Sequence, residues 1–354
     1  MPSASGATET LSLPGIEGTT TLTEPRPGHW IERGPQKRLM LFAGRSNPEL
    51  AEKIAERLGI ELGEVTLKTF ADGETYCKYE ESIRGADVFL IQTGSGPVDR
   101  NLMELLIMIN AAQLASAKRI TVVVPWFPYS RQDKKSAPRE PITAKLVADF
   151  LQVAGADRVL TMDLHAGQIQ GFFKIPVDHM TALPLIANHF RDLGLSGEGV
   201  VSVSPDPGRA KMAVKFAQML EADFAVMHKT RPGHDQVSVT EVTGRVRGKI
   251  AIIGDDIIST GGTLLAGAQA LKDAGATEVW VFATHGLFSD GALERFAKAD
   301  LAGVVVTDTV PIDPLHRPDN LTVLTVSSLL AETIWNVFSD DSVSAIFAGE
   351  NQLF

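Results

Sequence analysis

The most constraining feature of this sequence is a regular alternation of short apolar runs with helical patterns. Continuous runs rich in Val, Ile and Leu occur at residues 87–93, 119–127, 158–165, 199–206, 223–228, 249–256, 278–286, 303–310 and 321–327. Helical patterns lie between some of these runs, at residues 101–117, 143–154, 208–222, 263–275 and 328–339. Continuous apolar strands separated by helices are typical of parallel sheets covered on both faces. The sequence therefore predicts an α/β protein.

Changes in composition along the 354 residues predict two domains and a tail. Residues 1–36 are rich in Ser, Thr, Gly, Pro and Glu without an apolar period, so we expect a disordered N-terminal tail. A strand-like run begins at Lys37, and the stretch SNPELAEKIAERLG then shows a capped helix start. We expect an N-terminal domain over residues 37–182 and a C-terminal domain over residues 183–330. Residues 331–354 are expected to form a helix and tail that pack back on the N-terminal domain.

Charge and composition exclude several classes of function. The net charge of −10 argues against nucleic acid or an anionic membrane surface as the main partner. Cys77 is the single cysteine, so no intrachain disulfide can form and nothing points to an oxidising compartment. No apolar stretch approaches the ~18 residues of a membrane span, and the first residues lack the features of a signal peptide. We expect a soluble cytoplasmic protein.

Two adjacent acids, Asp255 and Asp256, end the apolar run KIAII and are followed by a Ser-Thr-Gly-Gly turn. Such a turn at a helix N-terminus presents backbone N–H groups that suit a phosphate. Carboxylates beside it would repel the phosphate unless they bind sugar hydroxyls or a metal. A phosphorylated sugar meets both demands. The alternative is a capped helix start with a solvated acid pair.

Further polar groups follow the ends of predicted strands, where ligands bind in open α/β sheets. Asp206 ends one strand, and Asp163 and His165 end another. A lone histidine at a strand end is more often structural, but in this company a metal or phosphate contact is favoured. The loop PWFPYSRQDKKSAPRE is basic beside aromatic residues, which is typical of a nucleotide site or of a solvated surface. Lys229 and Arg231 enter a Pro/Gly loop suited to stabilising a transferring phosphoryl group.

From about Lys37 onward the chain resembles the ribose-phosphate diphosphokinases, also called phosphoribosyl pyrophosphate synthetases. The resemblance rests on the stretches NPELAEKIAERLG, FADGE, NLMELLIMINA, YSRQDKK, AKLVADFLQVAGADRVLTMDLHAGQIQGFF, SPDPG and DDIISTGGT. The last motif alone would indicate any phosphoribosyltransferase-type fold, whereas residues 101–173 narrow the match to this family. The resemblance implies an α/β fold of two similar phosphoribosyltransferase-like domains, each a mainly parallel sheet flanked by helices. It also implies transfer of the diphosphoryl group of Mg-ATP to O1 of ribose 5-phosphate, giving phosphoribosyl pyrophosphate and AMP.

The resemblance also assigns functional residues to matching positions of this chain. At ribose 5-phosphate it implies Asp255 and Asp256 for the 2- and 3-hydroxyls, and for the 5-phosphate the loop Ser259, Thr260, Gly261, Gly262 and Thr263. For the Mg²⁺ of Mg-ATP it implies His165 and Asp206 as ligands, and for ATP itself it implies contacts from His165, Arg131 and Gln132. It also implies that a loop with Phe70, Asp72 and Glu74 reaches the adenine of a neighbouring subunit. It implies catalysis by Lys229 and Arg231, and an allosteric phosphate or ADP site at Ser82, Arg84, Ser342 and Ser344.

The family pattern carries expectations about assembly and shows three departures in this chain. Family members form hexamers built from dimers, and many are inhibited by ADP and activated by phosphate, so a homo-oligomer with these effectors is expected. Ser259 and Ser136 stand where many members carry acids, and Arg209 stands where many carry a glycine. At Ser259 we expect altered affinity rather than lost activity. Arg209 would either add a phosphate contact or crowd the site.

Two alternative functions remain open at this point. A non-catalytic regulatory paralogue that assembles with an active synthetase has no need to keep His165, Lys229, Arg231 and both acids of the pair. A phosphoribosyltransferase acting on a nucleobase would use the synthetase product as its substrate. It would need neither the FADGE and YSRQDKK stretches nor a second domain.

Overall fold

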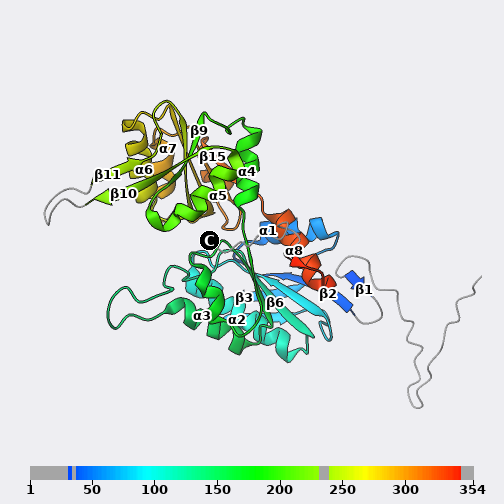
Figure 1. Ribbon diagram of the computed structural model, residues 1–354. Coiled ribbons are helices and arrows are strands. Elements are labelled where there is room, and N and C mark those ends of the chain that lie inside the picture. The colour runs from blue at the N-terminus through cyan, green and yellow to red at the C-terminus, as the bar shows by residue number, and fades with distance from the viewer. Residues whose placement is uncertain (1–30, 34–36, 231–238, 344–354) are drawn as a thin grey trace, which may run out of the picture.

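The computed structural model describes residues 31–33, 37–230 and 239–343, which form two large sheets flanked by helices (Figure 1). The first sheet has the strand order β1-β2-β5-β6-β7-β8. Its strands are β1 (Ile31–Arg33), β2 (Lys37–Ala43), β5 (Asp87–Ile91), β6 (Arg119–Val124), β7 (Arg158–Met162) and β8 (Val177–Met180). Neighbouring strands run parallel, except that β1 pairs antiparallel with β2.

The second sheet has the strand order β11-β10-β9-β12-β13-β14-β15. Its strands are β9 (Val200–Ser204), β10 (Asp223–Thr230), β11 (Val239–Thr243), β12 (Ile250–Ile258), β13 (Glu278–Gly286), β14 (Gly303–Thr307) and β15 (Leu321–Leu324). Only β10 and β11 pair antiparallel within the described part of this sheet. From β9 the chain builds outward in both directions, with β10 on one side and β12 on the other. This reversal is a topological switch point between β9 and β12.

Helices cover both faces of each sheet because the apolar strands have no solvent-exposed face. One face of the first sheet packs against α2 (Val98–Leu114) and α3 (Thr143–Ala154), and the other against α1 (Pro48–Leu58) and α8 (Ser327–Ser339). One face of the second sheet packs against α6 (Gly262–Asp273) and α7 (Ala292–Lys298), and the other against α4 (Leu183–Asp192) and α5 (Ala210–Leu220). A separate hairpin, β3 (Val65–Thr69) and β4 (Thr75–Tyr79), lies against α2.

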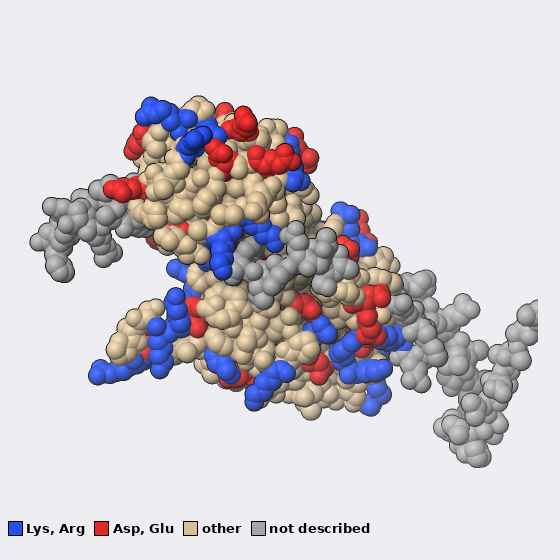
Figure 2. Space-filling model, viewed as in Figure 1, with Lys and Arg blue, Asp and Glu red and all other residues tan. Residues whose placement is uncertain are grey.

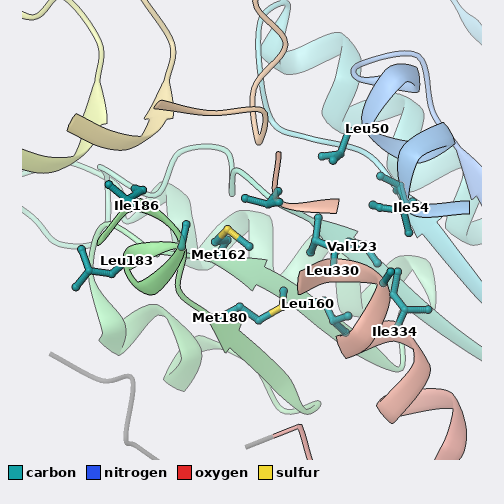
Figure 3. Close-up of a cluster of buried hydrophobic side chains, with 14 of the residues drawn as sticks. Leu50, Ile54, Val123, Leu160, Met162, Met180, Leu183, Ile186, Leu330 and Ile334 are labelled. Carbon is teal, nitrogen blue, oxygen red and sulfur yellow. The ribbon is translucent and has the colours of Figure 1, made fainter. Parts of the chain in front are cut away.

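One apolar cluster joins the two halves of the molecule, the first half being built on the first sheet and the second half on the second sheet. Figure 3 shows Leu160 of β7 among side chains of α1, α4 and α8, including Leu330. The same cluster continues to Phe282 and Val305 of the second sheet. Because α8 packs beside α1, the end of the described chain lies against the first half (Figure 1). The two sheets therefore share buried apolar surface, which fixes how their strand ends face each other.

The predicted α/β fold of mainly parallel sheets flanked by helices is confirmed, with two differences in detail. The first concerns the predicted tail: Ile31–Arg33 form β1, because antiparallel pairing with β2 gives their backbone groups partners. Residues 1–30 and 34–36 lie outside the described residues. The second concerns the acid-bearing strand, which was expected to end at Asp256 but runs on to Ile258.

Candidate active site

The candidate site lies at the switch point of the second sheet, facing the first. Asp206 lies two residues after the end of β9, and Asp255 and Asp256 lie near the end of the neighbouring strand β12. His165 follows β7 of the first sheet, and its Nδ1 atom lies 2.8 Å from Oδ2 of Asp256. Strand ends from both halves therefore meet at one place, where open α/β sheets bind their ligands.

The predicted phosphate loop connects β12 to α6 with a conformation that requires glycine. Gly261 has a φ of 73°, and a Cβ atom at this position would lie 2.2 Å from Cε2 of Phe296. The loop is fixed from outside by Ser289, whose N–H donates to the carbonyl of Ser259 at 3.0 Å. Among the described residues no side chain caps the N-terminus of α6, so its first N–H groups are available to an anion.

The other predicted loop residues differ in exposure. Ser259 is partly buried, as is Gly261, whereas Thr260, Gly262 and Thr263 are exposed. Arg295 donates from Nη2 to the carbonyl of Thr260 at 2.9 Å. The exposed face of the loop thus combines hydroxyl groups with free backbone N–H groups, both of which donate to phosphate oxygens.

Arg209 is the centre of a cluster that joins the acid pair to His165. Its Nη2 atom donates to Oδ1 of Asp256 at 2.6 Å and lies 2.8 Å from Nδ1 of His165. Its Nε atom is 3.1 Å from Oδ1 of Asp255, and its Nη1 donates to the carbonyl of His165 at 3.1 Å. Nδ1 of His165 therefore has a donor, the Arg209 guanidinium group, and an acceptor, the Asp256 carboxylate, both at 2.8 Å, and it can pair with only one of them at a time.

Burial and the neighbouring carboxyl group separate the pKa values of the acid pair. Burial above all, and then the hydrogen bond to and charge of Asp256, raise the pKa of Asp255 to about 8. Burial also opposes ionisation of Asp256. Hydrogen bonds with His165 and Asp255, together with the charge of Arg209, outweigh that burial and lower the pKa of Asp256 below its usual range. Near neutral pH the pair therefore holds one ionised and one protonated carboxyl group.

A pocket of about 290 Å³ opens beside this cluster. His165, Arg209 and Asp256 contribute to its wall, together with Gln168, Lys211 and Thr284. These residues come from both sheets, so the pocket lies between the two halves. Its volume is close to the lower end of the range for small-molecule sites, about 300 Å³.

Apart from His165, the residues predicted at ATP lie in two exposed loops. Phe70, Asp72 and Glu74 form the tip of the β3–β4 hairpin, where the N–H of Glu74 donates to Oδ1 of Asp72 at 3.1 Å and Phe70 is 51% exposed. Arg131 and Gln132 lie in the exposed loop between β6 and α3, where Oε1 of Gln132 accepts from the Thr143 hydroxyl group at 2.6 Å. Figure 2 shows Lys and Arg side chains along this loop, on a protein of net charge −10.

The predicted metal and catalytic residues are brought together only in part. Oδ1 of Asp206 accepts from the N–H groups of Gly208 and Arg209, at 2.7 and 3.2 Å, and so caps the turn that carries Arg209. In the described part of the chain, no group of three or more His, Cys, Asp and Glu side chains is arranged to hold a metal. Lys229 lies on β10, and Arg231 falls outside the described residues. The Mg²⁺ and catalytic assignments remain predictions.

Three of the predicted regulatory residues lie in the described part of the chain: Ser82 and Arg84 in the β4–β5 connection and Ser342 just after α8. Nη2 of Arg38 donates to the carbonyls of Ser82 and Arg84, at 2.8 and 3.3 Å. The carbonyl of Ser342 accepts from Nδ2 of Asn336 at 3.1 Å. Ser344 falls outside the described residues, so this site also remains a prediction.

Sequence reasoning missed the buried polar network that joins the two halves behind the site. The hydroxyl group of Thr284 donates to Oδ2 of Asp163 at 2.6 Å, and that of Thr93 donates to the carbonyl of Thr309 at 2.7 Å. Nδ2 of Asn47 donates to the carbonyl of Asp308 at 2.8 Å. Each contact joins residues more than 100 positions apart. The polar residues that follow the apolar runs were a signal that such a network exists, but they did not indicate which residues form hydrogen bonds with each other.

Comparison with known proteins identifies the family. The model for the N-terminal domain of ribose phosphate pyrophosphokinase matches residues 39–155, and the phosphoribosyl synthetase-associated domain matches residues 230–348. A ribose-phosphate pyrophosphokinase from Fusobacterium nucleatum is 49% identical over 87% of this chain and 97% of its own length. The chain belongs to the ribose-phosphate pyrophosphokinase family.

Two further relatives agree with this family assignment. A ribose-phosphate pyrophosphokinase from Corynebacterium efficiens is 48% identical over 91% of this chain and 99% of its own length. The crystal structure of phosphoribosylpyrophosphate synthetase from Mycobacterium smegmatis superimposes with a TM-score of 0.80, at 46% identity over 85% of this chain and 99% of that one. No helix in the described ranges is long and apolar enough to cross a membrane.

Proposed function

We propose that this chain transfers the diphosphoryl group of Mg-ATP to O1 of ribose 5-phosphate, which yields phosphoribosyl pyrophosphate and AMP. The observation that supports this function most directly is the acid pair on β12 beside the open N-terminus of α6. Carboxylates suit sugar hydroxyl groups and the helix N-terminus suits a phosphate, so one ligand that carries both fits the arrangement. The relatives named ribose-phosphate pyrophosphokinase support the same reaction.

The proposed roles of the chain's residues follow from this arrangement. The loop Ser259–Thr263 holds the 5-phosphate, and the acid pair accepts hydrogen bonds from the 2- and 3-hydroxyls, which places O1 toward the first half. O1 then attacks the β-phosphorus of ATP in line and gives up its proton to solvent. The bond between that phosphorus and the oxygen bridging it to the α-phosphorus breaks, and AMP leaves. Lys229 and Arg231 neutralise the transferring group, as cations do in phosphoryl transfer.

Mg²⁺ is the metal that we propose for this site. Oxygen ligands and phosphates are what Mg²⁺ prefers, and the site offers Asp206 together with the imidazole ring of His165. When bound, Mg²⁺ would neutralise phosphate oxygens of ATP. Oδ2 of Asp256 lies 2.8 Å from Nδ1 of His165, so that carboxylate contacts the imidazole ring as well as the sugar.

We also propose a homo-oligomer, a hexamer built from dimers, located in the cytoplasm. The supporting observation is an apolar stripe on α3, where Leu146, Phe150 and Val153 are 48, 44 and 83% exposed at helical spacing. Apolar side chains gathered on one exposed helix face mark a contact surface. Met103 and Leu114 of α2 are also exposed. Phosphate as activator and ADP as inhibitor belong to the same proposal.

The deciding experiment measures AMP formation from Mg-ATP with a coupled assay, with and without ribose 5-phosphate. The expected result is AMP release that depends on ribose 5-phosphate and equals the phosphoribosyl pyrophosphate formed. AMP release without the sugar would indicate hydrolysis instead. Absence of AMP from purified homo-oligomer, together with stimulation of a related active synthetase when the two are mixed, would favour the regulatory paralogue.

A further inference from the structure

Arg209 occupies the centre of the proposed sugar and metal site. Its guanidinium group contacts three side chains that would otherwise face a ligand: Asp255, Asp256 and His165. Asp256 is 4% exposed, so its negative charge needs a nearby cation. Here the chain supplies that cation itself.

The side chain of Arg209 is held from both ends. Its backbone belongs to the short turn Pro207–Arg209, which Asp206 caps through two N–H groups. Its Nη1 atom donates to the carbonyl of His165, across the junction between the two halves. A group positioned in this way loses little conformational entropy when it forms its contacts. Arg209 is therefore part of a built arrangement and not an extended surface side chain.

We propose that Arg209 is a tethered cation that competes with divalent metal ions for the carboxylates of the acid pair in the ligand-free chain. Carboxylate oxygens are ligands that divalent ions accept. A guanidinium nitrogen 2.6 Å from Oδ1 of Asp256 excludes such an ion from that oxygen. A divalent ion and Arg209 placed about 4 Å apart would also repel each other in a partly buried site. Metal binding to these carboxylates therefore requires Arg209 to move away.

The second part of the inference rests on the proposed function. Ribose 5-phosphate brings a phosphate that attracts the released guanidinium group and hydroxyl groups that bind the acid pair. We therefore expect the sugar phosphate to displace Arg209 and to open the cluster to the metal. Binding of sugar and metal then becomes cooperative, and each raises the affinity of the other by the same factor.

Lys211 provides a matched control for Arg209. It lies two residues further along, lines the same pocket and carries the same charge. It is exposed, and within the described residues it forms no ion pair with the acid pair. Removing the charge of Lys211 changes the field of the pocket without opening the cluster. A gain in metal affinity found only at Arg209 would therefore report on direct competition.

The test is a titration of the ligand-free oligomer with Mn²⁺ alone, in which free Mn²⁺ is followed by electron paramagnetic resonance. Arg209→Met should bind Mn²⁺ at least about tenfold tighter than the unaltered chain. Arg209→Lys, which keeps the charge, and Lys211→Met should both stay within about twofold of it. If Arg209→Met does not fold, Arg209→Gln replaces it with the same expectation. Unchanged Mn²⁺ affinity in the folded variant, or an equal gain in Lys211→Met, would overturn the proposal.

Adding ribose 5-phosphate to the same titration tests the second part. Mn²⁺ affinity of the unaltered chain should rise, and the rise should be several-fold smaller in Arg209→Met because the competitor is already gone. An equal rise in both proteins would refute displacement by the sugar while leaving the competition itself intact. Because Mn²⁺ binding is read without ATP, failure of either part is distinct from a failure of the coupled AMP assay.

Discussion

Asn47 offers a direct test of how the two halves of the molecule are joined behind the site. Its Oδ1 accepts from the N–H of Leu50 at 3.3 Å and so caps α1, while its Nδ2 donates to the carbonyl of Asp308 at 2.8 Å. Asn47 is 5% exposed, so neither bond competes directly with bulk water. Two variants separate these two roles: Asn47→Ser keeps a capping oxygen but is too short to reach Asp308, and Asn47→Ala removes both.

The expected losses follow from the two bonds. Without the donor, the buried carbonyl of Asp308 is left unpaired, which costs about 1–3 kcal/mol of the free energy of unfolding in both variants. Loss of the cap costs about 1 kcal/mol more in Asn47→Ala. We therefore expect Asn47→Ser to lose about 1–3 kcal/mol and Asn47→Ala about 2–4 kcal/mol.

Urea unfolding followed by tryptophan fluorescence and far-ultraviolet circular dichroism measures both losses, provided that the dependence on urea is unchanged. Separate transitions for the two probes would indicate that the halves unfold independently, and each would then be fitted alone. The argument fails if Asn47→Ser unfolds at the same urea concentration as the unaltered chain. In that case Asn47 would act as a helix cap only, and the bond to Asp308 would contribute nothing to the joining of the halves.

Four further predictions concern single residues. Lys229→Ala should lower turnover at least about a hundredfold with little change in ATP binding; near-normal turnover would remove its catalytic role. Ser259→Asp should leave the KM for ribose 5-phosphate unchanged or lower, and lost activity would instead make the hydroxyl group a required phosphate donor. The pKa of Asp255 is raised from 3.8 to about 8, so between these pH values its carboxyl group is protonated in the folded chain and ionised in the unfolded chain. Its contribution to the free energy of unfolding is therefore full below pH 3.8 and lost as pH rises through 8. The Tm of the ligand-free chain should fall between pH 6 and pH 9, and it should fall less in Asp255→Asn. Burial raises the pKa of the Cys77 thiol to about 11, so iodoacetamide at pH 8 should label it at least about tenfold more slowly than free cysteine, and fast labelling would contradict this pKa.

Local patterns in the sequence were sufficient to predict most of the elements that carry the site. The helix expected at residues 143–154 is observed at Thr143–Ala154, and the strand expected at residues 278–286 at Glu278–Gly286. Both are long, with a single period along their length, so local propensity and tertiary packing favour the same structure. The strands β8 and β11 were not predicted, because their sequences VDHM and VTEVT contain polar residues instead of a continuous apolar run.

The organisation of the site depends on contacts that no local pattern contains. The switch point could be located only when β9 and β12 were found to be neighbours, although their sequences are separated by β10 and β11. The sequence marked Arg209 as a departure from the family pattern but left its role open between a phosphate contact and a crowded site. Its partners come from β12 and from the loop after β7, and only the packing of the two halves brings these together.

The three departures from the commoner family pattern change the charge of the site in the same direction. Arg209 adds a positive charge where many members carry a glycine, and Ser259 and Ser136 each remove a negative one. Arg209 lies against the acid pair, Ser259 in the loop between β12 and α6, and Ser136 in the basic loop before α3, so all three lie in segments that we propose to bind substrate. A more positive site attracts anionic substrates and repels free divalent ions. These substitutions should therefore strengthen the binding of ribose 5-phosphate at low metal concentration and weaken metal binding in its absence, which is the direction that competition by Arg209 requires.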